Sequence, residues 1–208
     1  MNSRAETSWS PGQSVRLFGP RVRVHTLTER DLDDSINVWT GSAERNEFVW
    51  KPNMSIRDYM LGLIQHCDNV SRFIFGIRES ETNKLIGYRK VQLTTEDNGR
   101  GAELTAIPTT VIGDRWAGQT YGQESGALVN WFLLRAVQVR AVSPRIYDAN
   151  DKTWQLAEKL GYRLVRRTEE SSARGSLIVR HYTITAEELE ARWSDLFANF
   201  RMEAAARQ

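Results

Sequence analysis

The alternation of apolar and polar positions predicts seven strands along the chain. It is clearest over residues 21–27, where charged and apolar side chains follow one another with the period of a half-buried strand. Six further runs share the strand pattern and are bounded by turn residues. The predicted strands cover residues 21–27, 72–78, 84–94, 102–112, 137–146, 162–168 and 176–185.

Helical spacing predicts five helices around these strands. Thr28 and Ser55 are residue types that cap helices, and apolar residues follow each of them at helical intervals. Gly161 is placed to end the helix that Asp151 begins. The predicted helices cover residues 28–39, 55–67, 121–135, 151–160 and 185–204.

The order of these elements indicates one α/β domain. The links between the strands of residues 72–112 are short, so these three strands form an antiparallel meander. A helix–strand–helix–strand–strand segment follows, and we expect a mixed, mostly antiparallel sheet of about six or seven strands. The expected parts are a flexible arm over 1–14, the domain over 15–185 and an added C-terminal helix over 186–208.

Composition places the chain among ordinary globular proteins. Hydrophobic residues make up 40% and charged residues 26% of its 208 positions. Cys67 is the only cysteine, which excludes an intrachain disulfide and a zinc site of several cysteines. The net charge of +2 is too small to predict a nucleic-acid partner. With no long apolar run and no secretory signal, we expect a cytoplasmic protein without a membrane partner.

The stretch from Val111 to Ser125 carries the first candidate chemistry. It runs from a strand through a turn that contains Gly113 and Gly118, and then directly into a helix. The N–H groups at a helix start are unpaired and carry a partial positive charge, so an anion fits there. A plain strand-to-helix turn would have the same sequence pattern, so both interpretations stay open on this stretch alone.

A second stretch, from Asn150 to Tyr162, begins a helix directly after a strand. Together with the loop, the order of motifs resembles the GNAT superfamily of acyl-CoA-dependent N-acyltransferases, and its RimJ/RimL-like branch in particular. The resemblance covers about residues 15–185 and implies a GNAT-like fold whose sheet is splayed at the cofactor site. The other motifs that carry it are Leu17 to Val24, Phe75-Gly76-Ile77 and Leu85-Ile86-Gly87.

The resemblance implies a binding site for acetyl-CoA or another acyl-CoA as co-substrate. Main-chain groups of Thr110 and Ile112 are implied to contact the pantetheine arm, as is Asn150, and Thr153 is implied to reach the phosphates. A simple helix-start role for Asn150 fits the sequence equally well. The amides implied to hold the pyrophosphate belong to Gly118, Gln119, Thr120, Tyr121 and Gly122.

Three positions depart from the family pattern. Ala117 stands where the loop usually has Arg or Gln, and Thr120 stands where it has its middle Gly. Weaker cofactor binding, an unusual donor and a loop that still works through its amides all stay open. Ala157 replaces the Tyr that usually serves as the acid, so the resemblance assigns no acid.

The acceptor side of the reaction needs a base, because an amine with a pKa near 10 is mostly protonated at pH 7. The resemblance implies that Glu103 is this base, while an outward-facing strand carboxylate is the alternative. Phe48 and Trp50 lie where relatives build a wall of the acceptor groove, and core packing fits them equally well. The three His residues are scattered and show no metal spacing, so no metal is expected.

The resemblance implies an N-acetyltransferase that moves an acyl group from acyl-CoA to a primary amine. The acceptor is a small molecule, a natural product or antibiotic, or a peptide N-terminus. An inactive GNAT-like binding module is one alternative. Another is an enzyme with a different donor, such as a long acyl-CoA, an acyl carrier protein or an aminoacyl-tRNA.

The last predicted helix has an apolar stripe that must be covered. Either its own domain or a second copy of the chain covers it, so both a monomer and a homodimer stay open. The residues of the stripe are Leu189, Trp193, Leu196, Phe197 and Phe200.

Overall fold

The computed structural model describes residues 9–40, 53–97, 102–172 and 175–206. Its main sheet has seven strands in the order β10-β1-β2-β3-β4-β5-β6, and every neighbouring pair is antiparallel except β5 and β6. The strands are β1 (Ser14–Phe18), β2 (Val22–Thr26), β3 (Arg72–Glu79), β4 (Leu85–Asp97), β5 (Ala102–Ile112), β6 (Ala141–Val142) and β10 (Arg201–Ala205). The predicted antiparallel meander is confirmed as β3, β4 and β5.

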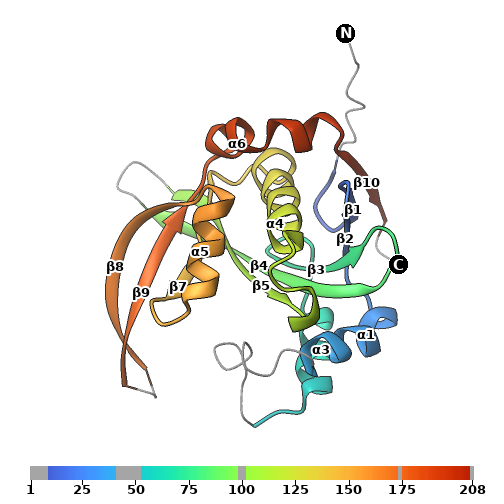
Figure 1. The fold of residues 1–208 in the computed structure, drawn as a ribbon, viewed down its shortest axis with the longest axis horizontal. Helices are drawn as coiled ribbons and strands as arrows, with labels where there is room; N and C mark the ends of the chain where they lie inside the picture. The colour runs from blue at the N-terminus through green and yellow to red at the C-terminus, as the bar shows by residue number, and fades with distance from the viewer. Residues whose placement is uncertain (1–8, 41–52, 98–101, 173–174, 207–208) are drawn as a thin grey trace.

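A smaller sheet stands beside the main one and has the order β7-β9-β8. Its strands are β7 (Arg145–Tyr147), β8 (Arg163–Ser172) and β9 (Gly175–Thr183). Two main-chain hydrogen bonds of 3.0 Å between Val142 and Ile184 join the two sheets. Figure 1 shows the smaller sheet diverging from β4 and β5 on the left of the molecule.

Helices cover both faces of the main sheet (Figure 1). On one face lie α1 and α3, with a core that includes Trp39, Tyr59 and Met60. On the other face α4, α5 and α6 cover a larger core. The helices are α1 (Leu32–Thr40), α3 (Ile56–Gln65), α4 (Tyr121–Trp131), α5 (Asp151–Leu160) and α6 (Ala186–Ala198). Two short 3-10 helices, η1 (Glu29–Asp31) and η2 (Asp114–Trp116), and a π-helical segment, η3 (Phe132–Ala136), complete them.

The predicted single strand over residues 137–146 is wrong. The chain forms two short strands there, β6 and β7, and each belongs to a different sheet. Gln138 has a positive φ of 62°, and Pro144 lacks the N–H that a continuous ladder would need. The break allows β7 to leave the main sheet and pair with β9.

The predicted helix to residue 204 is also corrected. Helix α6 ends at Ala198, and residues 201–205 form β10, which pairs with β1 at the edge of the main sheet. Within the described chain, the apolar stripe packs on its own domain, because Leu189 and Phe197 are buried and Trp193 lies against the same core.

The N-terminal arm is in contact with the core where it is described. The Trp9 ring lies edge-on to Phe132 at 5.3 Å between centroids and 6.0 Å from Phe73. Strand β1 begins at Ser14, close to the expected start of order at Val15. No helix in the described ranges is long and apolar enough to cross a membrane.

Candidate functional site

The two sheets form a fork at β5. Strand β6 pairs only with Thr105 and Ala106, and β7 then turns away to join β9. From Ile107 onward, β5 has no strand neighbour on that side among the described residues. This is the splayed strand that the sequence resemblance implied.

Main-chain groups of the even-numbered residues of β5 point into the fork. The carbonyl of Ala106 accepts from Ser143 N at 2.7 Å on this side, while Gly113 N donates to Ile86 O on the β4 side at 2.9 Å. Because hydrogen-bonding direction alternates along an antiparallel strand, Thr110 directs its N–H and C=O toward the open edge. Pro108 occupies the same kind of position and brings no N–H to it.

The loop before α4 presents a run of free amides. Within the described residues, none of the amides from Gly118 to Gly122 has an acceptor, and the next one, Gln123 N, donates to Thr120 O at 2.9 Å. Gly118 has a φ of 79°, and a side chain there would meet no atom within 4 Å. Unpaired amides at the positive end of a helix dipole suit a phosphate group.

Arg21 lies against this loop from the turn between β1 and β2. Its Nη1 donates to Thr120 Oγ1, and its guanidinium lies 4.5 Å from the centroid of the Tyr121 ring. Thr120 has a φ of 68°, in the left-handed region that suits glycine better than a β-branched residue. The loop therefore gains an exposed cation from outside its own sequence, although Ala117 supplies none.

Glu124 on α4 fixes the turn that carries Arg21. Its Oε1 accepts from Arg21 N at 2.8 Å and from Val22 N at 3.1 Å. Gly19 allows this close approach, because a Cβ there would lie 2.5 Å from the same oxygen. Tyr121 is held as well, since its hydroxyl donates to Glu79 at 2.6 Å, and this bond raises the pKa of Tyr121.

The start of α5 lies on the other side of the fork. Asn150 caps this helix, and its Oδ1 accepts from Thr153 N at 3.3 Å. The structure thus shows the helix-start role of Asn150. The Thr153 residue is exposed at the same helix end. A side chain on Gly122 would lie 3.4 Å from Leu156 of α5, so α4 and α5 pack closely at this point.

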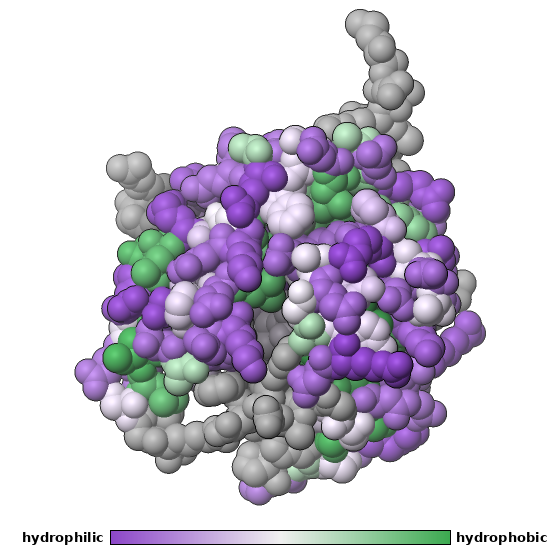
Figure 2. All heavy atoms as spheres, in the orientation of Figure 1, coloured by the Kyte–Doolittle hydropathy of each residue, from purple (hydrophilic) through white to green (hydrophobic). Residues whose placement is uncertain are grey.

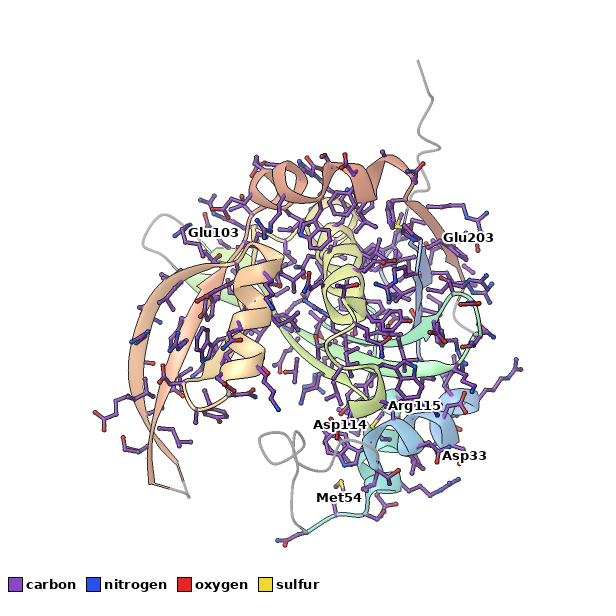
Figure 3. All side chains as sticks on the ribbon, in the orientation of Figure 1. Asp33, Met54, Glu103, Asp114, Arg115 and Glu203 are labelled. Atoms are coloured by element: carbon purple, nitrogen blue, oxygen red, sulfur yellow. The ribbon has the colours of Figure 1, made fainter. Side chains whose placement is uncertain are left out.

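Glu103 lies at the far end of β5 from the loop (Figure 3). Thr110 is seven positions further along the strand, a distance of about 23 Å. Its side chain is 31% exposed and accepts from Arg140 Nε at 2.9 Å. Glu103, Thr105 and Ile107 share one face of the strand and line a groove of about 450 Å³.

The groove lies between β5 and the smaller sheet. Its walls carry more cationic than anionic side chains: Arg140, Arg145, Arg163 and Arg166 against Glu103. His181 also lines it, with Nε2 at 2.7 Å from Thr168 Oγ1. Within the described ranges, no three His, Cys, Asp or Glu side chains form a group that could hold a metal ion.

Ala157, at the position of the expected acid, is buried in the core. Tyr162 is also buried, and its hydroxyl donates to Asn130 Oδ1 at 3.0 Å. Phe48 and Trp50 lie outside the described residues, so the structure does not place these two predicted wall residues. Figure 2 shows a mostly hydrophilic surface that is hollowed between the α5 side and the α4 side.

Sequence reasoning missed two cations of this region, Arg21 and Arg89. The sequence gives no local sign of the role of Arg21, because this residue reaches the loop only when Glu124 binds the main chain of its turn. Arg89 did leave a signal, because Arg89 and Lys90 are charged residues inside the otherwise apolar run from Leu85 to Val91. A charge within a strand whose two faces are both covered points to a specific role.

Comparisons with known proteins agree with this geometry. A family model described as an acetyltransferase (GNAT) domain matches residues 21–163. Mycobacterium smegmatis RimJ in complex with CoA-disulfide superposes with a TM-score of 0.70 at 15% identity, covering 94% of this chain and 99% of that one. No curated protein matches the sequence.

Two Vibrio structures are similar in fold. Spermidine N-acetyltransferase from Vibrio cholerae, in complex with CoA and spermine, gives a TM-score of 0.65 at 14% identity, covering 81% of this chain and 98% of that one. The ribosomal-protein-S5-alanine acetyltransferase from Vibrio fischeri gives 0.65 at 13% identity, with coverages of 82% and 96%. These likenesses confirm the α/β fold that the sequence resemblance implied.

Proposed function

The chain belongs to the GNAT acetyltransferase family, and we propose that it is an N-acyltransferase that uses acetyl-CoA or another acyl-CoA. The acceptor is a primary amine on a small molecule, a natural product or antibiotic, or a peptide N-terminus. The observation that carries the proposal is the run of free amides from Gly118 to Gly122 at the start of α4. We place the enzyme in the cytoplasm.

The loop binds the pyrophosphate of the co-substrate through these amides. Arg21 adds a charge-assisted contact, which compensates for Ala117. The pantetheine arm then follows the open edge of β5, where Thr110 and Ile112 contact it, with Asn150 and Thr153 on the α5 side. This path leads the thioester from the α4 face into the fork.

The amine attacks the thioester carbonyl directly in a ternary complex. At the open edge of β5, Thr110 N–H is placed to polarise the carbonyl oxygen, whereas Pro108 has no N–H to offer. Because Glu103 lies about 23 Å along β5 from Thr110, it receives the amine proton through a chain of several waters in the groove, and Arg140 keeps its carboxylate in place. Phe48 and Trp50 are the residues that we propose to contact the acceptor.

The activities named for two similar structures illustrate the acceptor range. One acts on spermidine and another on an alanine of ribosomal protein S5. The cationic walls of the groove favour an acceptor that carries acidic groups beside its amine, rather than a polyamine.

An inactive binding module is the second candidate. The observation in its favour is Ala157, which places a buried methyl group where relatives carry a proton donor. Such a module would bind acetyl-CoA without turnover, whereas an enzyme with another donor would prefer that donor in a panel. That panel compares acetyl-CoA with a long acyl-CoA, an acyl carrier protein and an aminoacyl-tRNA as donors.

Calorimetric and melting experiments with acetyl-CoA test the proposed site. At about 100 times its Kd, a ligand stabilises the fold by about 2.7 kcal/mol, so the wild-type Tm should rise. Gly122→Asp places a negative charge against the phosphates and should abolish this rise. Gly62→Asp makes the same change on α3, where a new Cβ meets no atom within 4 Å, and should retain it. Unchanged acetyl-CoA affinity in folded Gly122→Asp would refute the phosphate site.

A kinetic experiment tests Glu103. Glu103→Gln should lower kcat about 100-fold and flatten the acid limb of the pH–rate profile, with little change in acetyl-CoA binding. Arg140→Gln removes the partner but keeps the base, so it should cost far less. A Glu103→Gln enzyme within about threefold of wild type would leave Glu103 with a structural role only.

A further inference from the structure

Arg89 is a cation buried in the sheet beside the fork. It comes from β4, is 2% exposed, and lies directly opposite Thr110 of β5. Its Nη1 donates to Thr110 Oγ1 at 3.2 Å. Its Nη2 donates to Asn130 Oδ1 of α4 at 2.7 Å and to the Tyr162 hydroxyl at 3.3 Å.

No carboxylate balances this charge. Among the described residues, no Asp or Glu lies within ion-pair distance of Arg89, although eight other arginines form such pairs. Across residues 9–40, 53–97, 102–172 and 175–206, neither its Nε nor the nearby Asn130 Nδ2 has a hydrogen-bond partner. A buried charge without an opposite charge is costly, and groups of this kind concentrate where a protein uses them.

The position of Arg89 relates it to the reaction centre. Its guanidinium holds the side chain of Thr110, whose main chain faces the open edge of the fork. Gly126 allows α4 to pack closely against the guanidinium, because a Cβ at that position would lie 3.1 Å from Nη1. The cation is therefore enclosed between α4 and the strand along which the thioester is proposed to lie.

Two other sources of stabilisation for negative charge are missing nearby. Pro108 contributes no N–H to the open edge, and Ala157 contributes no proton donor. Negative charge nevertheless develops during acyl transfer. The amine nitrogen forms a bond to the carbonyl carbon, the C–S bond breaks, and sulfur leaves with the electron pair. The amine proton passes to a base, and the thiolate takes a proton from solvent.

We propose that Arg89 is a positioning residue whose buried positive charge stabilises the departing CoA thiolate and fixes Thr110 at the open edge of β5. The proposal rests on the proposed function, since it needs the pantetheine arm in the fork. A charge fixed in a site of low dielectric acts strongly on a nearby developing charge and needs no reorganisation during the reaction.

The thiol pKa of bound CoA measures this effect without an acceptor. It can be read from the thiolate absorbance of the protein–CoA complex as a function of pH. In the wild type, the thiol pKa should lie about one unit below that of free CoA, a tenfold difference in thiolate at a given pH. Arg89→Lys keeps the charge and should keep most of this shift. Arg89→Met should lose it, while CoA affinity changes less than about threefold.

The outcomes separate the two claims. A wild-type protein that does not bind CoA refutes the proposed function and the inference with it. A protein that binds CoA, but whose thiol pKa is the same in Arg89→Met as in the wild type, refutes the inference alone. Loss of the shift in folded Arg89→Lys would also refute it, because the charge is retained. Should Arg89→Met not fold, Arg89→Gln offers a neutral side chain that can still bond Asn130.

Discussion

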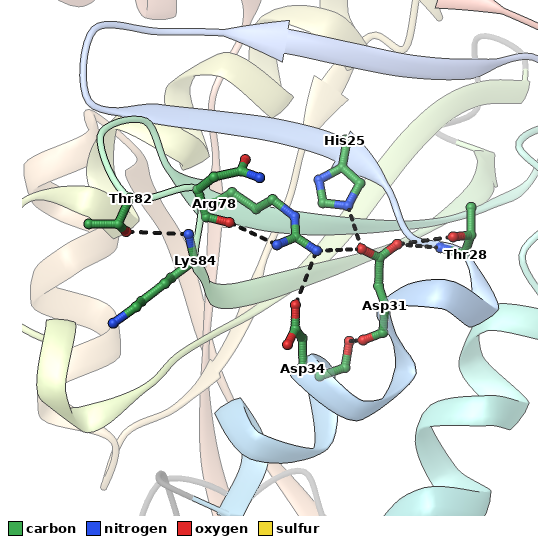
Figure 4. A network of polar contacts seen from close by, with 9 residues as sticks. His25, Thr28, Asp31, Asp34, Arg78, Thr82 and Lys84 are labelled. Carbon is green, nitrogen blue, oxygen red and sulfur yellow. Dashed lines mark hydrogen bonds and ion pairs between the residues drawn. The ribbon is translucent and has the colours of Figure 1, made fainter.

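Asp31 and Arg89 are both buried ions, and the fold treats them in opposite ways. Asp31 is the last residue of η1, directly before α1, and its carboxylate contacts groups that complement its charge (Figure 4). Arg89 lies under α4, and its hydrogen-bond partners in the described part of the chain are all neutral. The first arrangement stabilises the fold, whereas the second keeps an unbalanced charge beside the candidate site.

Asp31 accepts hydrogen bonds at both carboxylate oxygens. Arg78 Nη2 lies 2.6 Å and His25 Nε2 3.2 Å from Oδ1, while Thr28 donates its N–H to Oδ2 at 3.0 Å. Burial alone would raise the pKa of Asp31. The hydrogen bonds from His25, Thr28 and Arg78 lower it by more, so the pKa lies well below its usual range. The network ties β2 and β3 to α1.

The Arg89 cluster has the opposite balance. The guanidinium of Arg89 donates to the neutral oxygens of Thr110, Asn130 and Tyr162. Two buried donors beside these bonds, Arg89 Nε and Asn130 Nδ2, have no acceptor among the described residues. Burial raises the pKa of Tyr162 and the Arg89 charge lowers it, with a net rise, so this hydroxyl stays protonated at neutral pH. A region built for stability alone would have placed a carboxylate or an apolar side chain here.

The largest expected effect comes from removing the Asp31 charge. Asp31→Asn leaves Arg78 and His25 facing a neutral amide in a site that is 11% exposed. Breaking a buried ion pair in this way costs about 3 kcal/mol, which urea unfolding at pH 7 should show. Asp33→Asn is the matched control two residues further on, in α1, because the Asp33 side chain of its pair with Arg57 is 85% exposed. The control should change stability by less than about 0.5 kcal/mol.

Acid should remove the stabilisation by the ionised Asp31 carboxylate gradually, as the carboxylate is protonated. Because the folded pKa of Asp31 is depressed, its contribution is complete above its unfolded pKa near 4 and is lost as the pH falls toward the folded value. Unfolding free energy measured from pH 6 to pH 2.5 should therefore fall more steeply in the wild type than in Asp31→Asn. Parallel curves for the two proteins would contradict the network's electrostatic role.

Local signals explain what could be predicted from the sequence. Thr28 starts the helical segment that the sequence predicted and forms a capping box with Asp31, and α5 has its predicted bounds because Asn150 caps it and Gly161 ends it at a φ of 98°. The free amides of the loop before α4 could also be predicted from local sequence. A turn that leads directly into a helix leaves the first amides of that helix without partners.

Long-range pairing explains what could not be predicted. Residues 201–205 are mostly helix formers, yet they form β10 because the edge of β1 is available to pair with them. Arg21 reaches the loop only through the docking of a distant turn by Glu124. The charge of Arg89 is visible in the sequence of its strand, but only the strand register sets it opposite Thr110.

Replacing Arg89 should change stability far less than replacing Asp31, and this difference sharpens the comparison most. Arg89→Met removes a buried cation that has no anionic partner among the described residues and replaces it with an apolar side chain that can fill much of the same space. Tyr162 still donates to Asn130 Oδ1 at 3.0 Å, so that acceptor keeps a partner when the guanidinium is gone.

Replacing a buried ion by an apolar group is often neutral or stabilising, so the unfolding free energy of Arg89→Met at pH 7 should stay within about 1 kcal/mol of wild type. The same urea titration that shows a large loss for Asp31→Asn serves as the measurement. A loss above about 2 kcal/mol would mean that Arg89, like Asp31, holds the fold together. If Arg89→Met is as stable as the wild type but raises the thiol pKa of bound CoA, the Arg89 charge serves the reaction and not the fold.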